Sequence, residues 1–191
     1  MSIPGTPQRI SPRTPADEGA APGGGRESVS PSGLIGSGEI YIARDGTWYH
    51  EGRPFKRTDL ARLFSTILRR EADGTYWLKT PVETVRVHVA DAPFVAREVR
   101  REDRDGRQVL SFRTNLGDWV EAGPEHPLRV EVDPETGEPS PYIRVRDGLD
   151  ALLARTVFYE LVEMAEPAAD AAGNEVYGVW SHGEFYRLGT G

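Results

Sequence analysis

The chain has no cysteine among its 191 residues. This absence excludes disulfide bonds, thiolate nucleophiles and zinc sites built on cysteine. No apolar run approaches the roughly 20 residues that a membrane-spanning helix needs, and the N-terminal stretch lacks the apolar segment of a signal peptide. We therefore expect a soluble protein of the cytoplasm.

Aromatic residues are missing from the first 36 residues, which hold six prolines and seven glycines. Such a stretch buries too little apolar surface to offset the entropy of ordering it, so residues 1–36 are predicted to form a disordered tail. The glycine-rich runs at 23–25 and 33–38 lack the strand, the lysine and the helix of a phosphate loop. We interpret both runs as linker.

Positive charge is also in short supply. The chain has 23 Lys and Arg against 30 Asp and Glu, a net charge of −7. The three arginines of the tail balance its three acids, so the whole excess lies in residues 37–191. Nonspecific binding to duplex nucleic acid needs clustered positive charge, so we expect no such partner. A local basic pocket remains compatible with this composition.

What the chain does contain is a series of short alternating segments separated by turn signals. Asp-Gly pairs such as Asp45-Gly46 are typical of tight hairpins because they tolerate positive φ. The segments between such turns alternate apolar and polar residues, as β-strands do. Strands are predicted at 39–43, 47–51, 76–80, 85–90, 95–101, 108–114, 119–122, 128–133, 142–146, 176–181 and 184–188.

Two helices are predicted, each of about four turns. The first is expected to be capped by Thr58 or Asp59 and to reach Arg70. Its apolar residues recur at helical spacing and should face the core: Leu60, Leu63, Phe64, Ile67 and Leu68. The second helix is expected to begin near Asp147, on the spacing of Leu149, Leu152, Leu153, Val157 and Leu161.

These elements predict an α+β fold made of two small domains, residues 37–94 and 95–191. Each domain would pack one main helix on antiparallel strands. Twice along the chain a strand leads into a helix that antiparallel strands follow, which favours a duplicated motif. Identity between the halves is too low for the sequence alone to establish a duplication.

Several motifs occur in the order of a known family. They are W-x-H-x-G-x-P at Trp48–Pro54, L-F-x-x-I-L-R-R at Leu63–Arg70, D-G-x-Y-x-L-x-T-P-x-E at Asp73–Glu83, D-A-P-F at Asp91–Phe94, P-Y-I-R-V-R-D-G-L at Pro141–Leu149 and R-x-V-F-Y-E-L-V at Arg155–Val162. Together they resemble a bacterial family of uncharacterised proteins, domain of unknown function 1285.

The resemblance covers about residues 38–189 and leaves out the predicted tail. It implies a two-domain fold from a duplicated motif, with a C-terminal half similar to pleckstrin-homology-like rolls. It also implies a ligand site at the junction of the halves, a nucleotide-like ligand and a role in signalling. The family has no established activity, so the resemblance implies no reaction.

The histidines and carboxylates of the chain give little indication of an enzyme. No two of the four histidines lie at metal-ligand spacing, so neither a metal nor another cofactor is expected. Ser181-His182 is explained by a hairpin turn. Asp73, Glu83 and Asp91 are the candidates for paired catalytic carboxylates, and each falls in a turn or loop. A hydrolase is therefore only a minor alternative.

Arginines and aromatic residues offer a more specific hypothesis. Arg155 and Tyr159 lie at i, i+4 on one flank of the second predicted helix, and Arg57 precedes the first. Guanidinium groups beside aromatic rings suit a planar anionic ligand. The candidate ligand-binding residues are Trp48, His50, Arg57, Tyr76, Thr80, Glu83, Tyr142, Arg144, Arg146, Arg155 and Tyr159.

Two readings of this set remain open. The arginines can bind an anion between the halves, or they can pair with Glu83, Asp91 and Glu160 and lock the halves together. The leading functional hypothesis is a non-enzymatic signalling module that binds a small anionic, nucleotide-like ligand at the junction and relays this state to a protein partner. The alternative is a protein–protein adaptor with no small-molecule ligand.

Overall fold

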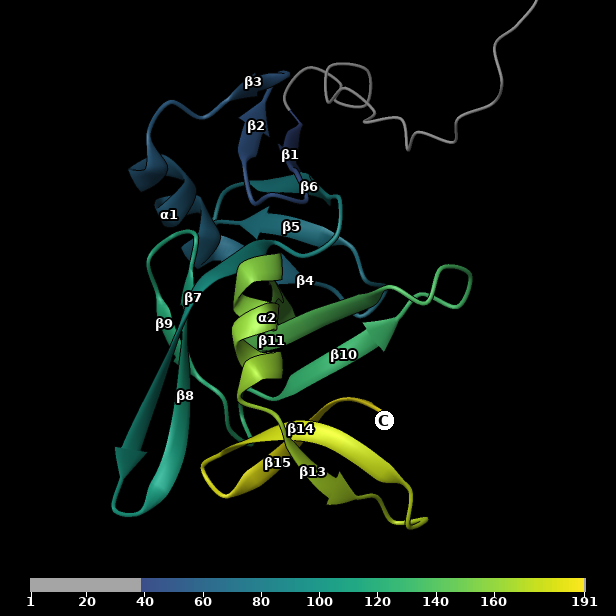
Figure 1. Ribbon diagram of the computed structural model, residues 1–191. Helices are drawn as coiled ribbons and strands as arrows, with labels where there is room; N and C mark the ends of the chain where they lie inside the picture. The colour runs from purple at the N-terminus through teal and green to yellow at the C-terminus, as the bar shows by residue number, and fades with distance from the viewer. Residues whose placement is uncertain (1–38, 191) are drawn as a thin grey trace, which may run out of the picture.

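A computed structural model describes residues 39–190 of the chain (Figure 1). The predicted tail, residues 1–36, lies outside the described residues. Over the described range the chain is mostly β, with two six-stranded sheets, one three-stranded sheet and two short helices. Neither of these helices is long and apolar enough to cross a membrane.

The first sheet has the strand order β3-β2-β1-β6-β5-β4, and helix α1 (Thr58–Ile67) lies between β3 and β4 in sequence. This sheet occupies the upper part of Figure 1. Its strands are β1 (Ile40–Ile42), β2 (Trp48–His50), β3 (Arg53–Pro54), β4 (Leu68–Arg70), β5 (Tyr76–Lys79) and β6 (Thr84–Val89).

The second sheet has the order β10-β11-β12-β7-β8-β9. Its strands are β7 (Phe94–Arg104), β8 (Arg107–Thr114), β9 (Trp119–Glu121), β10 (Leu128–Val132), β11 (Pro139–Arg146) and β12 (Leu149–Leu153). Helix α2 (Arg155–Glu163) follows, and the chain ends in a small antiparallel sheet of β13 (Glu166–Ala169), β14 (Glu175–Ser181) and β15 (Glu184–Thr190).

The two six-stranded sheets share one topology. Read from its β9 edge, the second sheet has the order β9-β8-β7-β12-β11-β10. If the strands of each sheet are numbered one to six along the chain, both sheets then have the order 3-2-1-6-5-4. In each sheet the first and last strands pair in parallel at the centre, and every other pair is antiparallel. The expectation of purely antiparallel sheets is therefore wrong by one pair in each sheet.

The repeated unit is also not the one that the sequence suggested. Helix α1 interrupts the first run of six strands, whereas α2 comes after the second run is complete. The two helices therefore do not hold equivalent places, and Arg57 and Arg155 are not counterparts.

The prediction of a helix from near Asp147 is wrong. Asp147 and Gly148 adopt positive φ values of 29° and 76° and turn the chain from β11 into β12. Strand β12 lies between β11 and β7, so most of its side chains are buried and it is almost continuously apolar. A short apolar run of this kind cannot be told from a helical segment by spacing alone.

The first helix is shorter than predicted and lacks the predicted cap. It ends at Ile67, because Leu68 has the extended values φ −69° and ψ 133° and begins β4. Its N-cap residue is Arg57, with no side-chain hydrogen bond to the first turn. The Asp73-Gly74 turn joins β4 to β5 and does not end the helix.

The core runs as one cluster of buried apolar side chains through both sheets, and among its fully buried members are Ile42, Leu68, Phe94, Leu110 and Ile143. The apolar stripe of α1 contributes less than predicted. Leu60 is 40% exposed and Leu63 61%, and the buried residues of this helix are Ala61 and Ser65. The expectation that the whole stripe faces the core is wrong.

Candidate functional site

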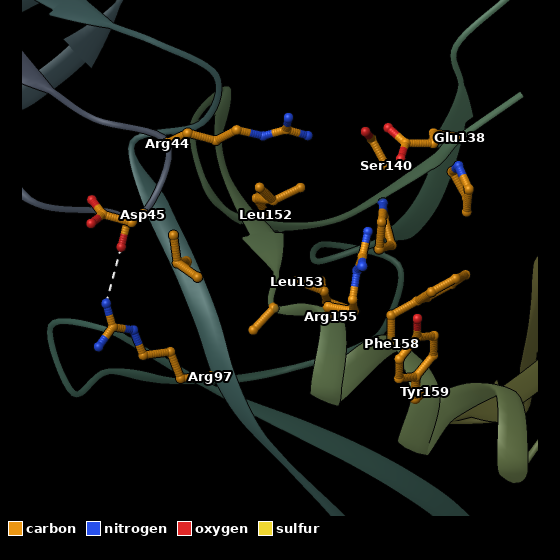
Figure 2. A pocket seen from close by; sticks show the side chains of 14 residues that line it. Arg44, Asp45, Arg97, Glu138, Ser140, Leu152, Leu153, Arg155, Phe158 and Tyr159 are labelled. Atoms are coloured by element: carbon orange, nitrogen blue, oxygen red, sulfur yellow. Dashed lines mark hydrogen bonds between the residues drawn. The ribbon is translucent and has the colours of Figure 1, made fainter. Parts of the chain in front are cut away.

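A pocket of about 670 Å³ lies between the β1–β2 turn, the start of β11 and the start of α2 (Figure 2). The two halves of the chain meet here, because β1 and β2 belong to the first sheet while β11 and β12 belong to the second. Of the residues in the described range, three arginines and two carboxylates line the pocket and give it a net charge of +1: Arg44, Arg97, Arg155, Asp45 and Glu138.

Arg155 is the first residue of α2, and its guanidinium makes no hydrogen bond or ion pair with any residue in the described range. The helix begins after Ala154, which has no side chain that could accept a hydrogen bond from the first turn, and no acidic residue lies there. The first N–H groups of a helix carry partial positive charge and attract anions. A cationic side chain and an uncapped helix start therefore coincide at this pocket.

Arg44 belongs to the first half and is held in place there by Asp91. Its Nε lies 3.0 Å from the Asp91 carboxylate, and the Tyr142 hydroxyl donates a 2.8 Å hydrogen bond to the other oxygen of Asp91. Figure 2 shows Arg44 and Arg155 extending into the same space, whereas Arg97 turns to the backbone carbonyl of Asp45, 3.0 Å away. Burial, helped by the hydrogen bond to Asp91, raises the pKa of Tyr142 to about 12.

Further hydrogen bonds join the halves away from the pocket. The Arg146 guanidinium donates to the carbonyl of Ser65 in α1 at 2.6 Å and lies over the Phe94 ring at 5.3 Å. Arg62 of α1 donates to the carbonyl of Leu116 at 2.8 Å. These contacts connect α1 to the second half at points outside the pocket lining.

The predicted site residues separate into groups. Arg155 and Tyr159 line the junction pocket. Tyr142 and Arg146 bridge the halves, and Arg144 forms a 2.5 Å ion pair with Asp150 inside the second sheet. None of these last three lines the junction pocket.

The other candidates lie in the first half. Trp48 is 2% exposed, so it is part of the core, and its indole N–H has no acceptor among the described residues. Arg57 is on the surface, 3.8 Å from Asp59, and does not reach the junction pocket. The Tyr76 ring lies under the Arg70 guanidinium at 5.8 Å, and burial raises the Tyr76 pKa. His50, Thr80 and Glu83 line a second pocket, beside α1.

Sequence reasoning missed several residues of the junction pocket, notably Arg44, Arg97, Ser140 and Phe158. Phe158 follows Arg155 by three positions and so shares its helix face, a signal that the helical spacing contained. The others gave no such signal, because Arg44 and Arg97 come from different sheets and meet only through the arrangement of the halves.

Comparison with known families identifies both halves. Residues 30–92 match the N-terminal domain of the DUF1285 family, a domain of unknown function, and residues 93–188 match the C-terminal domain of the same family of proteins of unknown function. A comparison with curated proteins found no match.

Two crystal structures of DUF1285 family proteins are similar to this chain. The protein from Silicibacter pomeroyi DSS-3 is 42% identical, with a TM-score of 0.71 over 87% of this chain and 90% of that one. The protein from Shewanella baltica OS155 is 28% identical, with a TM-score of 0.51 over 65% of this chain and 90% of that one. The two domain matches together span most of the described residues, and the chain belongs to the DUF1285 family.

Proposed function

We propose that this protein is a non-enzymatic module that binds a small anionic, nucleotide-like ligand in the junction pocket and relays that state to a protein partner. The observation that carries the proposal is Arg155. It stands at an uncapped helix start, makes no ion pair with a described residue, and faces Arg44 of the other half. A phosphate group placed there would accept hydrogen bonds from guanidinium and backbone N–H groups at once.

Aromatic side chains support the nucleotide-like part of the proposal. Phe158 and Tyr159 line the pocket one helical turn after Arg155, and Tyr159 is 56% exposed. A planar ring can stack on such a surface while its phosphate reaches the helix start. The pocket volume of about 670 Å³ also falls in the range of small-molecule sites, about 300–1,000 Å³.

The ligand would act on the partner through the junction. Because the pocket is lined from both halves, a bound anion adds interactions between Arg44 and Arg155 that the free protein lacks. Such a ligand favours the arrangement in which the halves are closed, and a partner that recognises this arrangement would sense the ligand. We also propose, as the family resemblance implies, that the fold arose from a duplicated motif and that its second half is similar to pleckstrin-homology-like rolls. The shared strand order of the two sheets supports the duplication.

A melting-temperature screen tests the ligand class. A ligand that binds only the folded protein raises its melting temperature with concentration. We expect AMP to give a saturable rise, inorganic phosphate a weaker one, and adenosine none, because adenosine lacks the anionic group that Arg155 would bind. A rise with adenosine equal to that with AMP, or no rise with either anion, would overturn the proposal.

The adaptor is the second candidate, and one feature of α2 favours it. Tyr159 and Val162 are 56% and 50% exposed and lie three positions apart, so they form a small apolar surface on one side of the helix. A peptide could pack on this surface without any small ligand. Under this reading no anion would raise the melting temperature, and Val162→Asp would abolish capture of a partner protein.

A further inference from the structure

The N-terminal half has a pocket of its own, of about 420 Å³, between α1 and the first sheet. It exists because α1 faces the core with small side chains, Ala61 and Ser65, while its larger apolar residues lie beside the gap. Phe64 and Ile67 form one wall, with Leu60 at 40% exposure near the opening. An apolar wall that stays open to solvent is unfavourable unless something covers it, and such surfaces mark binding sites.

Two polar side chains line this pocket without partners. The His50 imidazole and the Glu83 carboxylate make no hydrogen bond or ion pair with any residue of the described range 39–190. Hydrogen bonds to Thr80 hold the backbone of Glu83 in its turn. The Thr80 hydroxyl accepts a 3.0 Å hydrogen bond from the Glu83 N–H and donates one of 3.1 Å to its carbonyl. The pocket therefore combines apolar walls with one carboxylate and one imidazole, both from exposed residues.

We propose that this pocket binds a small amphipathic amine, with an apolar body between α1 and the sheet and a protonated amino group at Glu83 and His50. The charges of the lining residues favour an amine over an anionic ligand. Among residues 39–190, Glu83 is the one acidic residue that lines the pocket and no Lys or Arg lines it, and a neutral imidazole can accept a hydrogen bond. An ammonium head would donate to both groups, whereas a carboxylate or phosphate head would be repelled by Glu83. This site differs in location and in ligand charge from the junction pocket.

Three probes with the same six-carbon chain test the proposal: hexylamine, 1-hexanol and hexanoate. Each is titrated into the full-length protein, and the methyl NMR signals of Leu60, Ile67, Leu78 and Val85 report binding. We expect saturable shifts of these methyl groups, with hexylamine binding at least about tenfold tighter than hexanoate, since the ammonium gains a charge-assisted hydrogen bond.

Glu83→Gln removes the charge of an exposed side chain without changing its size, so it should not affect folding. This variant should bind hexylamine about tenfold more weakly than the wild type does and should bind 1-hexanol with unchanged affinity. Glu125→Gln, at an exposed glutamate of the second half, is the matched control and should change neither. The proposal is overturned if hexanoate binds as well as hexylamine, if Glu83→Gln has no effect, or if the pocket methyl signals do not respond. NOEs from residues 1–38 to the Phe64 ring would also overturn it, because the chain itself would then fill the pocket.

Discussion

Helices α1 and α2 both carry an apolar stripe, yet they relate to their sheets in different ways. Helix α1 lies within its run of six strands and leaves a pocket against the first sheet, and its Leu63 is 61% exposed. Helix α2 follows a finished run and buries Val157 and Leu161 completely, while its start opens to the junction. The two helices therefore differ in how much of their apolar stripe the core buries, although each borders a pocket.

The largest expected effect is a difference in stability loss when a leucine is truncated in the apolar stripe of α2 or of α1. Leu161→Ala should lower the free energy of unfolding by about 2–5 kcal/mol, because it removes a fully buried side chain and leaves a cavity. Leu63→Ala should change it by about 0.5 kcal/mol or less, since that side chain is largely exposed. Urea denaturation of both variants checks this comparison. Equal losses would mean that α1 packs on the core as α2 does.

The next effect concerns the contact that joins α1 to the second half. Arg146→Met removes the charge-assisted hydrogen bond to the Ser65 carbonyl and should cost about 1.5–3 kcal/mol. The methionine keeps an apolar stem against Phe94, which limits the loss to the hydrogen bond. Urea denaturation measures the cost. A loss below about 0.5 kcal/mol would show that Arg146 does not hold the halves together.

A smaller effect is expected at Tyr142. Tyr142→Phe removes the hydrogen bond to Asp91 and should cost about 0.5–1.5 kcal/mol at pH 7. The fold raises the Tyr142 pKa from 10.0 to about 12, so it favours the protonated hydroxyl. This stabilisation is fully present below pH 10 and is lost as the pH rises from about 10 to 12. The difference in unfolding free energy between wild type and variant should shrink over that window, and a difference that stays constant would contradict this account.

The smallest effect is expected at the start of α1. Arg57 and Asp59 are both about 80% exposed and 3.8 Å apart, which is the geometry of a weak surface pair. Arg57→Met should change the free energy of unfolding by about 0.5 kcal/mol or less and should leave AMP binding intact. Loss of AMP binding in this variant would place α1 at the ligand site and break the distinction between the helices.

Much of the β structure could be predicted from the sequence, because each strand is bounded by turn residues whose conformational preferences are local. The Asp45-Gly46 and Asp105-Gly106 hairpins are examples, with all four bounding strands in their predicted places. Strand β12 could not be predicted, because its burial depends on β7 and β11, and β7 begins more than 50 residues earlier. Residue types alone did not distinguish this buried strand from a helix.

The junction pocket shows the same division between local and distant information. Arg155 and Tyr159 were identifiable because they share a helix face, which is a local property. Arg44 was not, because it reaches the pocket only through the packing of the first half against the second. His50, Thr80 and Glu83 come from motifs that resemble the family, yet they gather beside α1 and not at the junction.

One titration tests the central claim, that Arg155 binds an anion at the junction. The dissociation constant for AMP is measured calorimetrically on wild type, Arg155→Met and the matched control Arg107→Met at the exposed tip of the β7–β8 hairpin, together with the melting temperature of each. We predict that Arg155→Met weakens AMP binding at least about tenfold, the loss of one charge-assisted hydrogen bond, with its melting temperature unchanged. Arg107→Met should bind as wild type does. Equal AMP affinity in wild type and Arg155→Met would contradict the account, and a large fall in the melting temperature of Arg155→Met would instead make Arg155 a structural lock between the halves.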